Sequence, residues 1–189
     1  MLKVTAEPKA ANPDTATARP PEVLATDRFG RASIFVLRML FAGVFLQGVA
    51  WKIPPDFGRD TGTGLFEWAS KAVEYPVFPP YSLLVENLVL PNIEIFGWMV
   101  ILTEGALGAF FLIGLATRLM GLIGFAQSLA IFLSVGLAPN EWPWAYYFMM
   151  GGCLVLAGTA AGRVAGVDAV LRPRLLAAGG WLRRLAIVT

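Results

Sequence analysis

The sequence contains no histidine and a single cysteine, so several common kinds of chemistry lack their usual residues. Histidine is the usual axial ligand of haem, the most frequent ligand of transition metals and the default general base of enzymes. The one cysteine, Cys153, cannot form an internal disulfide. We therefore expect no haem or metal ion to be held by this chain alone.

Charged residues are also scarce. They make up 15% of the 189 residues, against 57% hydrophobic residues, and the mean hydropathy is +0.64, which is more apolar than a soluble domain of this length. A helix needs roughly 20 residues to cross a hydrocarbon core about 30 Å thick. Four apolar segments have that length: 32–51, 92–115, 118–137 and 144–162. The sequence predicts an all-α polytopic membrane protein in which four transmembrane helices form an up-down bundle.

The chain divides into three parts by composition. Residues 1–28 are rich in Ala, Pro and Thr and have no apolar core of a signal peptide, which predicts a disordered cytoplasmic tail. Residues 29–162 form the four-helix domain, and 163–189 form a cytoplasmic amphipathic tail. Inside the domain, a long outer loop at 53–91 holds two amphipathic stretches, 64–75 and 80–89. Each is predicted to cap the bundle or to lie in the membrane surface, where a protein partner could dock.

Basic residues fall mostly on one side of this topology. Twelve of the 15 precede or lie in the first helix, or belong to the turn at Arg118 and the C-terminal tail. The segment from Lys52 to Pro91 has three basic residues and five acidic ones. The positive-inside rule therefore predicts cytoplasmic termini, and we expect the inner (plasma) membrane as the location. Leu and Ala alternate with the basic residues of the tail, which is typical of a lipid-facing anchor, so nucleic acid is not an expected partner.

Two ionisable side chains lie inside the predicted spans. Arg38 is seven residues beyond Arg31, about 10 Å along the first helix, and Glu104 lies near the middle of the second. An unpaired charge at such a depth costs about 2.5–3.5 kcal/mol. We therefore expect Arg38 and Glu104 to pair in a site that binds or protonates a quinone headgroup or an oxyanion. A structural ion pair, or an Arg38 that reaches the inner headgroups, remains open.

Other polar and aromatic residues are candidates for the same site. Glu94 and Trp98 share a glycine-bearing face of the second helix that we expect to look inward, and Gln127 lies on a similar face of the third. Gln47 lies near the depth of Glu104 on the first helix. The candidate binding residues are Arg38, Gln47, Glu94, Trp98, Glu104 and Gln127, with Arg38 and Glu104 as catalytic candidates. A second cluster, predicted at the outer surface, could surround the mouth of a cavity: Trp51, Lys52, Glu94, Glu141, Trp144 and Tyr146.

Several short motifs follow one another along the chain: an arginine-bearing first helix that ends in Trp-Lys, a Gly-x-x-Thr-Arg turn, an aromatic opening to the fourth helix and a closing Ala-Gly-Arg-x-x-Gly-x-Asp. In their order and spacing they resemble the DoxX superfamily, and within it the DoxD-like small subunit of thiosulfate:quinone oxidoreductase. The resemblance covers about residues 30–175. The family-motif residues are Trp51, Lys52, Arg118, Arg163 and Asp168. Asp168 and Arg172 stand four apart on a predicted short surface helix.

This resemblance implies an integral membrane subunit, or an accessory protein, of a quinone-linked redox complex. Quinone is then the expected cofactor, and other subunits or further copies of the chain are the expected protein partners. Any enzymatic role is at most that of the membrane subunit of a quinone-dependent oxidoreductase, and the matched arginines and Asp168 are expected to serve the fold first. A non-catalytic assembly subunit and a small-molecule carrier are the alternatives.

Overall fold

The computed structural model describes residues 27–52, 54–178 and 180–189, which form helices and turns without a strand. Except for Asp27 and Arg28, the predicted N-terminal tail lies outside the described residues. Within those residues, three helices are long and apolar enough to cross a membrane: α1 (Arg28–Val49), α4 (Ile93–Ile113) and α5 (Thr117–Val135). The chain is a multi-pass, all-helical membrane protein.

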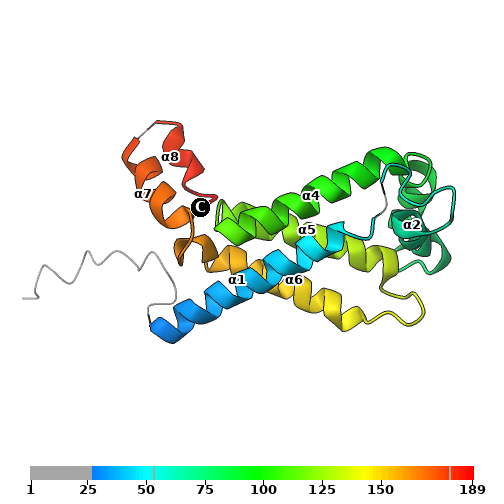
Figure 1. Cartoon of the computed structure of the whole chain (residues 1–189), viewed down its shortest axis with the longest axis horizontal. Helices are drawn as coiled ribbons and strands as arrows, with labels where there is room; N and C mark the ends of the chain where they lie inside the picture. The colour runs from blue at the N-terminus through cyan, green and yellow to red at the C-terminus, as the bar shows by residue number, and fades with distance from the viewer. Residues whose placement is uncertain (1–26, 53, 179) are drawn as a thin grey trace, which may run out of the picture.

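A fourth long helix, α6 (Pro143–Gly158), completes a bundle with these three. Each helix of the bundle packs against the next, and α6 returns to α1, so that the four surround one core. Figure 1 shows the consecutive helices running in opposite directions. The α6 helix has 16 residues and is shorter than the predicted segment 144–162, because the chain turns at Ala160, whose φ is 49°, into the 3-10 helix η3 (Ala161–Arg163).

The ends of the helices follow local rules. The side chain of Asp27 accepts a hydrogen bond of 3.0 Å from the backbone N–H of Gly30 and so caps the start of α1. Gly114 adopts a left-handed conformation with φ of 69° and ends α4, a position that favours glycine. Pro143 stands in the first turn of α6, where its missing N–H costs no helical hydrogen bond.

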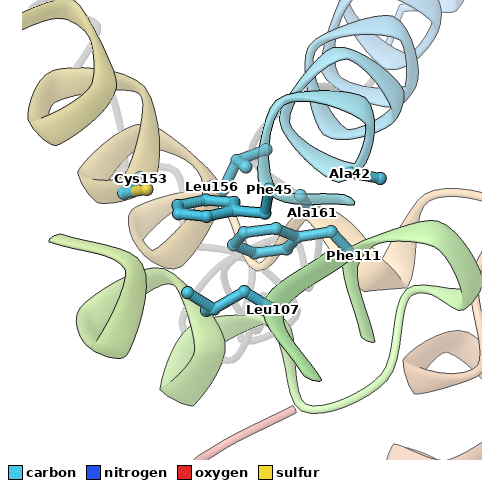
Figure 2. Packing of buried hydrophobic residues seen from close by; sticks show 7 residues of the cluster. All are labelled: Ala42, Phe45, Leu107, Phe111, Cys153, Leu156 and Ala161. Carbon is cyan, nitrogen blue, oxygen red and sulfur yellow. The ribbon is translucent and has the colours of Figure 1, made fainter. Parts of the chain in front are cut away.

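The middle of the bundle is apolar and closely packed. We call Phe45, Leu107, Phe111 and Leu156 the hydrophobic plug, because these side chains from α1, α4 and α6 meet at the axis (Figure 2) and are at most 2% exposed. Small residues allow this approach: a Cβ atom at Gly121 of α5 would lie 2.6 Å from the carbonyl oxygen of Cys153 on α6.

The two ends of the bundle differ in structure and charge. What we call the acidic end contains the loop after α1, α2 (Gly64–Glu74), α3 (Pro79–Leu84), the π-helix η2 (Val85–Val89) and the turn before α6. The basic end contains the start of α1, the α4–α5 turn, η3, α7 (Asp168–Ala178) and α8 (Leu182–Leu185). Figure 1 shows α2 at one extremity of the bundle, with α7 and α8 at the other.

Phe57 fastens the loop after α1 to α4. Its side chain is fully buried, and a Cβ atom at Gly97 would lie 2.5 Å from its ring. Its ring also meets Trp98 edge to face, with centroids 5.8 Å apart. This contact holds the loop at Phe57 against α4.

Candidate functional site

A buried ion pair lies where the acidic end meets the bundle. The Nζ atom of Lys52 lies 2.5 Å from Oε2 of Glu104, and the two side chains are 3% and 4% exposed. Gln127 on α5 donates from Nε2 to Oε1 of Glu104 at 3.2 Å, so both carboxylate oxygens accept a hydrogen bond. Lys52 also donates to the carbonyl oxygen of Gly48. Two donors from distant parts of the chain therefore converge on the carboxylate of Glu104.

Glycine at position 48 makes room for this carboxylate. A Cβ atom at Gly48 would lie 2.8 Å from Oε2 of Glu104, which is too close for an undisturbed contact. Lys52 lies just beyond the end of α1, and its side chain folds back along the helix to reach Glu104. Burial lowers the pKa of Lys52, while its hydrogen bond to Glu104 opposes that shift. The charge on Lys52 thus depends on the carboxylate beside it.

The pair lies on the wall of a cavity of about 520 Å³. Its lining comes from the end of α1, from α2, α3 and η2, and from α4, α5 and the start of α6. Most lining residues are apolar: Leu65, Ala69, Val85, Val89, Ile93, Phe96, Val100, Ala130, Ile131 and Val135. Trp51 and Trp68 also line it; their rings meet edge to face at 6.2 Å and are 42% and 39% exposed, so the cavity reaches the surface beside them.

A second set of polar residues lines the same cavity, and we call it the polar rim: Tyr81, Ser134, Glu141 and Tyr146. The hydroxyl of Tyr146 donates to Oε2 of Glu141 at 2.5 Å. The hydroxyl of Tyr81 lies 3.0 Å from Oγ of Ser134. These four side chains are half-buried. The cavity therefore combines apolar walls with two polar clusters, and such a cavity can bind an apolar molecule with a polar head and exchange a proton with it.

At the basic end, two buried charges bind the backbone. Arg38 is fully buried and donates to three carbonyl oxygens at 3.0–3.2 Å, those of Ala161, Val164 and Ala165. Asp168 is also fully buried and accepts from the N–H groups of Ala116 and Thr117 at 2.7 and 2.9 Å and from the Thr117 hydroxyl at 2.9 Å. We call this arrangement the basic-end lock, because it ties η3 and the start of α7 to α1 and α5.

The expected pairing of Arg38 with Glu104 is wrong. Arg38 contacts the region of Gly114, whereas Glu104 faces Gly48, ten residues farther along α1 and hence about 15 Å away along the axis. The hydrophobic plug lies between the two levels. Arg38 instead donates to carbonyl oxygens of η3 and of the turn after it, and Glu104 pairs with Lys52.

Of the other predicted binding residues, one lines the cavity and three do not. Gln127 bonds to Glu104 and lines the cavity. Gln47, Glu94 and Trp98 are exposed on the outside of α1 and α4 and are not among the lining residues. The buried face of α4 passes through Ile93, Gly97, Glu104, Leu107, Gly108 and Phe111, so the inward face is rotated away from Glu94 and Trp98.

The family-motif residues fall at opposite ends of the bundle. Trp51 and Lys52 line the cavity, while Arg118, Arg163 and Asp168 lie at the basic end. Arg163 donates to the carbonyl oxygen of Thr189 at 2.6 Å. Asp168 and Arg172 share α7 but do not pair: Asp168 points into the bundle and caps α5, and Arg172 bonds to the carbonyl oxygen of Ala186.

Sequence reasoning missed Lys52 as the partner of Glu104, and it missed Tyr81 and Ser134 as cavity residues. The available signal was a lysine one helical turn after Gly48, since an i, i+4 position allows its side chain to fold back over the last turn. Of the residues predicted around a cavity mouth, Trp51, Lys52, Glu141 and Tyr146 do line the cavity, whereas Glu94 and Trp144 do not.

Comparison with known families gives one match. Residues 73–184 match the family model described as "TQO small subunit DoxD". The match runs from the end of α2 into α8 and includes Glu104, Gln127 and Asp168, whereas Lys52 precedes it. Searches among curated proteins and among solved structures found no match. Because the matched segment covers more than half of the chain, this protein belongs to the DoxD family.

Proposed function

We propose that the chain is the membrane subunit of a thiosulfate:quinone oxidoreductase-like complex, and that its cavity receives the quinone headgroup. The observation that carries the proposal is the placement of Lys52, Glu104 and Gln127 on the wall of an otherwise apolar cavity. The name of the family, a small subunit, supports the presence of a further subunit in the complex.

The cavity suits a quinone in size and in chemistry. Its volume of about 520 Å³ lies within the range of about 300–1,000 Å³ that is usual for pockets holding an organic ligand. A quinone headgroup is a flat ring with two carbonyl oxygens, which accept hydrogen bonds. Lys52 and Gln127 supply N–H donors, and the aromatic rings of Trp51 and Trp68 offer flat apolar surfaces.

Reduction of a bound quinone to the quinol consumes two electrons and two protons. In the proposed mechanism, the ammonium group of Lys52 turns from Glu104 toward a carbonyl oxygen and orients the ring. Glu104, once protonated, donates its proton to the quinone near the same carbonyl oxygen. Gln127 holds the carboxyl group of Glu104 in place. The electrons come from thiosulfate, whose oxidation we assign to the partner subunit.

We further propose that α6 is the fourth span and that the basic end is cytoplasmic. With 16 residues α6 is about 24 Å long, and it packs along the transmembrane helix α5 more extensively than any other pair of helices packs. Trp142 and Trp144 at its start are 65% and 55% exposed, as suits an aromatic belt. The excess of arginine at the other end favours that side as cytoplasmic and the plasma membrane as the location.

Reduction of quinone by the purified complex tests the proposal. We expect Glu104→Gln and Lys52→Met each to lower thiosulfate-dependent quinone reduction by about 100-fold, the lower end of what a positioned proton-transfer group contributes. Glu94→Gln, a matched change of an exposed carboxylate on the same helix, should leave the rate unchanged. Unchanged rates in both cavity variants, with normal assembly of the complex, would refute the assigned roles.

A further inference from the structure

The Lys52–Glu104 pair has very different surroundings on its two sides. Toward the basic end, the next layer of the bundle is the hydrophobic plug, whose Phe45 and Phe111 rings lie 6.0 Å apart (Figure 2). Leu107 and Leu156 complete this layer and are fully buried. Apart from the thiol of Cys153, no titratable group belongs to the buried cluster around the plug within the described residues. Beyond it, the Nη atoms of Arg38 donate to backbone carbonyl oxygens, and the carboxylate of Asp168 accepts hydrogen bonds from Ala116 and Thr117.

Toward the acidic end, the pair faces the cavity, whose wall carries further titratable groups. Those that line it together with Lys52 and Glu104 are Tyr81 from α3, Glu141 from the turn before α6 and Tyr146 from α6. The elements α2 and η2 contribute no titratable side chain to the lining, and α5 contributes the neutral Gln127 and Ser134. Glu141 is thus the second carboxyl group of the cavity, and it is half-buried, nearer to solvent than Glu104.

The hydrogen bond from Tyr146 positions Glu141 toward this shared space. Its length of 2.5 Å is typical of a hydroxyl that donates to an ionised carboxylate. A cavity of about 520 Å³ with several polar groups has room for a chain of water molecules, each of which occupies about 30 Å³ in the liquid. Water can therefore connect the two carboxyl groups without any bond between them.

We propose that Glu141, positioned by Tyr146, is the proton entry site of the cavity, and that the Lys52–Glu104 pair exchanges protons with the compartment at the acidic end alone. A proton taken up by the Glu141 carboxylate passes through cavity water to the Glu104 carboxylate. Glu141 then returns to its ionised form and Glu104 becomes neutral. The hydrophobic plug blocks the same exchange from the basic end.

If the cavity binds quinone as proposed above, both protons of the quinol are drawn from the compartment at the acidic end. The sidedness itself can be measured without quinone. Its failure can therefore be distinguished from failure of the quinone assignment.

The test follows the protonation of Glu104 in vesicles that contain the full chain in a known orientation. Infrared spectroscopy records the carboxyl band of Glu104, identified by its loss in Glu104→Gln, after an acid jump on one side of the membrane. We expect a response to the jump at the acidic end and none to a jump at the basic end. Glu141→Gln should slow the response by about 100-fold, and Tyr146→Phe should slow it less.

Glu67→Gln is the matched control, because Glu67 is exposed on α2 at the same end but does not line the cavity, and its response should equal that of the wild type. A response to a jump at the basic end, a missing response to both jumps, or a normal rate in Glu141→Gln would overturn the proposal. A second measurement labels an introduced cysteine, which is possible because the chain has only one native cysteine to replace. In a Cys153→Ala background, Ser134→Cys should react with a membrane-impermeant thiol reagent added at the acidic end; reaction only from the basic end would contradict the assigned route.

Discussion

The acidic and basic ends of the bundle both bury charged side chains, but they use them differently. At the basic end, Arg38 and Asp168 bond to backbone groups that belong to fixed turns. At the acidic end, Lys52 and Glu104 bond mainly to side chains and face a cavity. A charge that satisfies the backbone cannot leave without breaking the fold, whereas a charge held by other side chains can turn toward a ligand. The difference separates structural charges from functional ones.

Removal of the basic-end lock should have the largest effect on stability. Asp168→Ala deletes three hydrogen bonds and leaves the part-buried N–H of Ala116 and the buried N–H of Thr117 unsatisfied. We expect a loss of about 3 kcal/mol or more, since a hydrogen bond to a charged group contributes about 1.5–3 kcal/mol. Denaturation in detergent micelles measures this free energy, with Glu94→Gln as the control. A stability close to wild type would show that the lock is not structural.

Removal of Lys52 or Glu104 should lower stability less than removal of the basic-end lock does, but it should lower quinone reduction more. Glu104→Gln leaves Lys52 as a lone cation, but water in the cavity can solvate it, so we expect a loss of about 1–3 kcal/mol. In the double variant Lys52→Met with Glu104→Leu, no charge remains unpaired, and stability should recover. Quinone reduction should stay lost. Full activity in the double variant would mean that the pair serves the fold alone, as in an assembly subunit.

A smaller effect is expected where the backbone leaves space for Glu104. Gly48→Ala places a Cβ atom 2.8 Å from Oε2 of Glu104 and displaces the carboxylate from Lys52. We expect this displacement to weaken the binding free energy of quinone by about 1 kcal/mol, the lower end of the cost of overpacking. This corresponds to a roughly fivefold loss of quinone affinity. Gly43→Ala on the same helix is the matched control, since nothing lies within 4 Å of its added Cβ atom. Titration with a short-chain quinone measures the affinity. Equal quinone affinities in the two variants would contradict the role of the Glu104 carboxylate next to Gly48.

The smallest effect belongs to polar and aromatic residues outside the cavity. Gln47→Leu and Trp98→Phe alter exposed side chains that do not line it. We expect the quinone affinity to remain within about twofold of the wild type, as for sites that share no partners. The same titration measures it. A tenfold loss of quinone affinity in either variant would indicate that quinone binds on the outer surface of α1 and α4 instead.

Hydropathy and charge were sufficient to predict a multi-pass helical membrane protein, and the resemblance of its short motifs indicated the DoxD family. The depth of Arg38 and Glu104 was enough to predict that both are buried. Their partners could not be predicted in the same way. A partner depends on how each helix is rotated and shifted against its neighbours, which sequence spacing leaves undetermined. Lys52 illustrates this, because its position after α1 suggests an interface anchor, yet its side chain folds back to Glu104.

The rotation of α4 explains the remaining errors. Glu94 and Trp98 are neighbours on a helical projection and Glu104 lies at the margin of their face, but only Glu104 faces the bundle. Phe57 from the following loop occupies the groove at Gly97 and meets Trp98 from the side. That packing comes from a segment between helices, so no periodicity within α4 could indicate it.

Photoaffinity labelling with an azidoquinone tests the central claim most directly. After illumination of the complex in its membrane, mass spectrometry identifies the labelled peptides, and an excess of unlabelled quinone serves as competitor. We expect competed labels on cavity residues such as Val100 and Ile131, with labelling lost in Glu104→Gln. Competed labels near Arg38 and Asp168 instead, with none in the cavity, would contradict it.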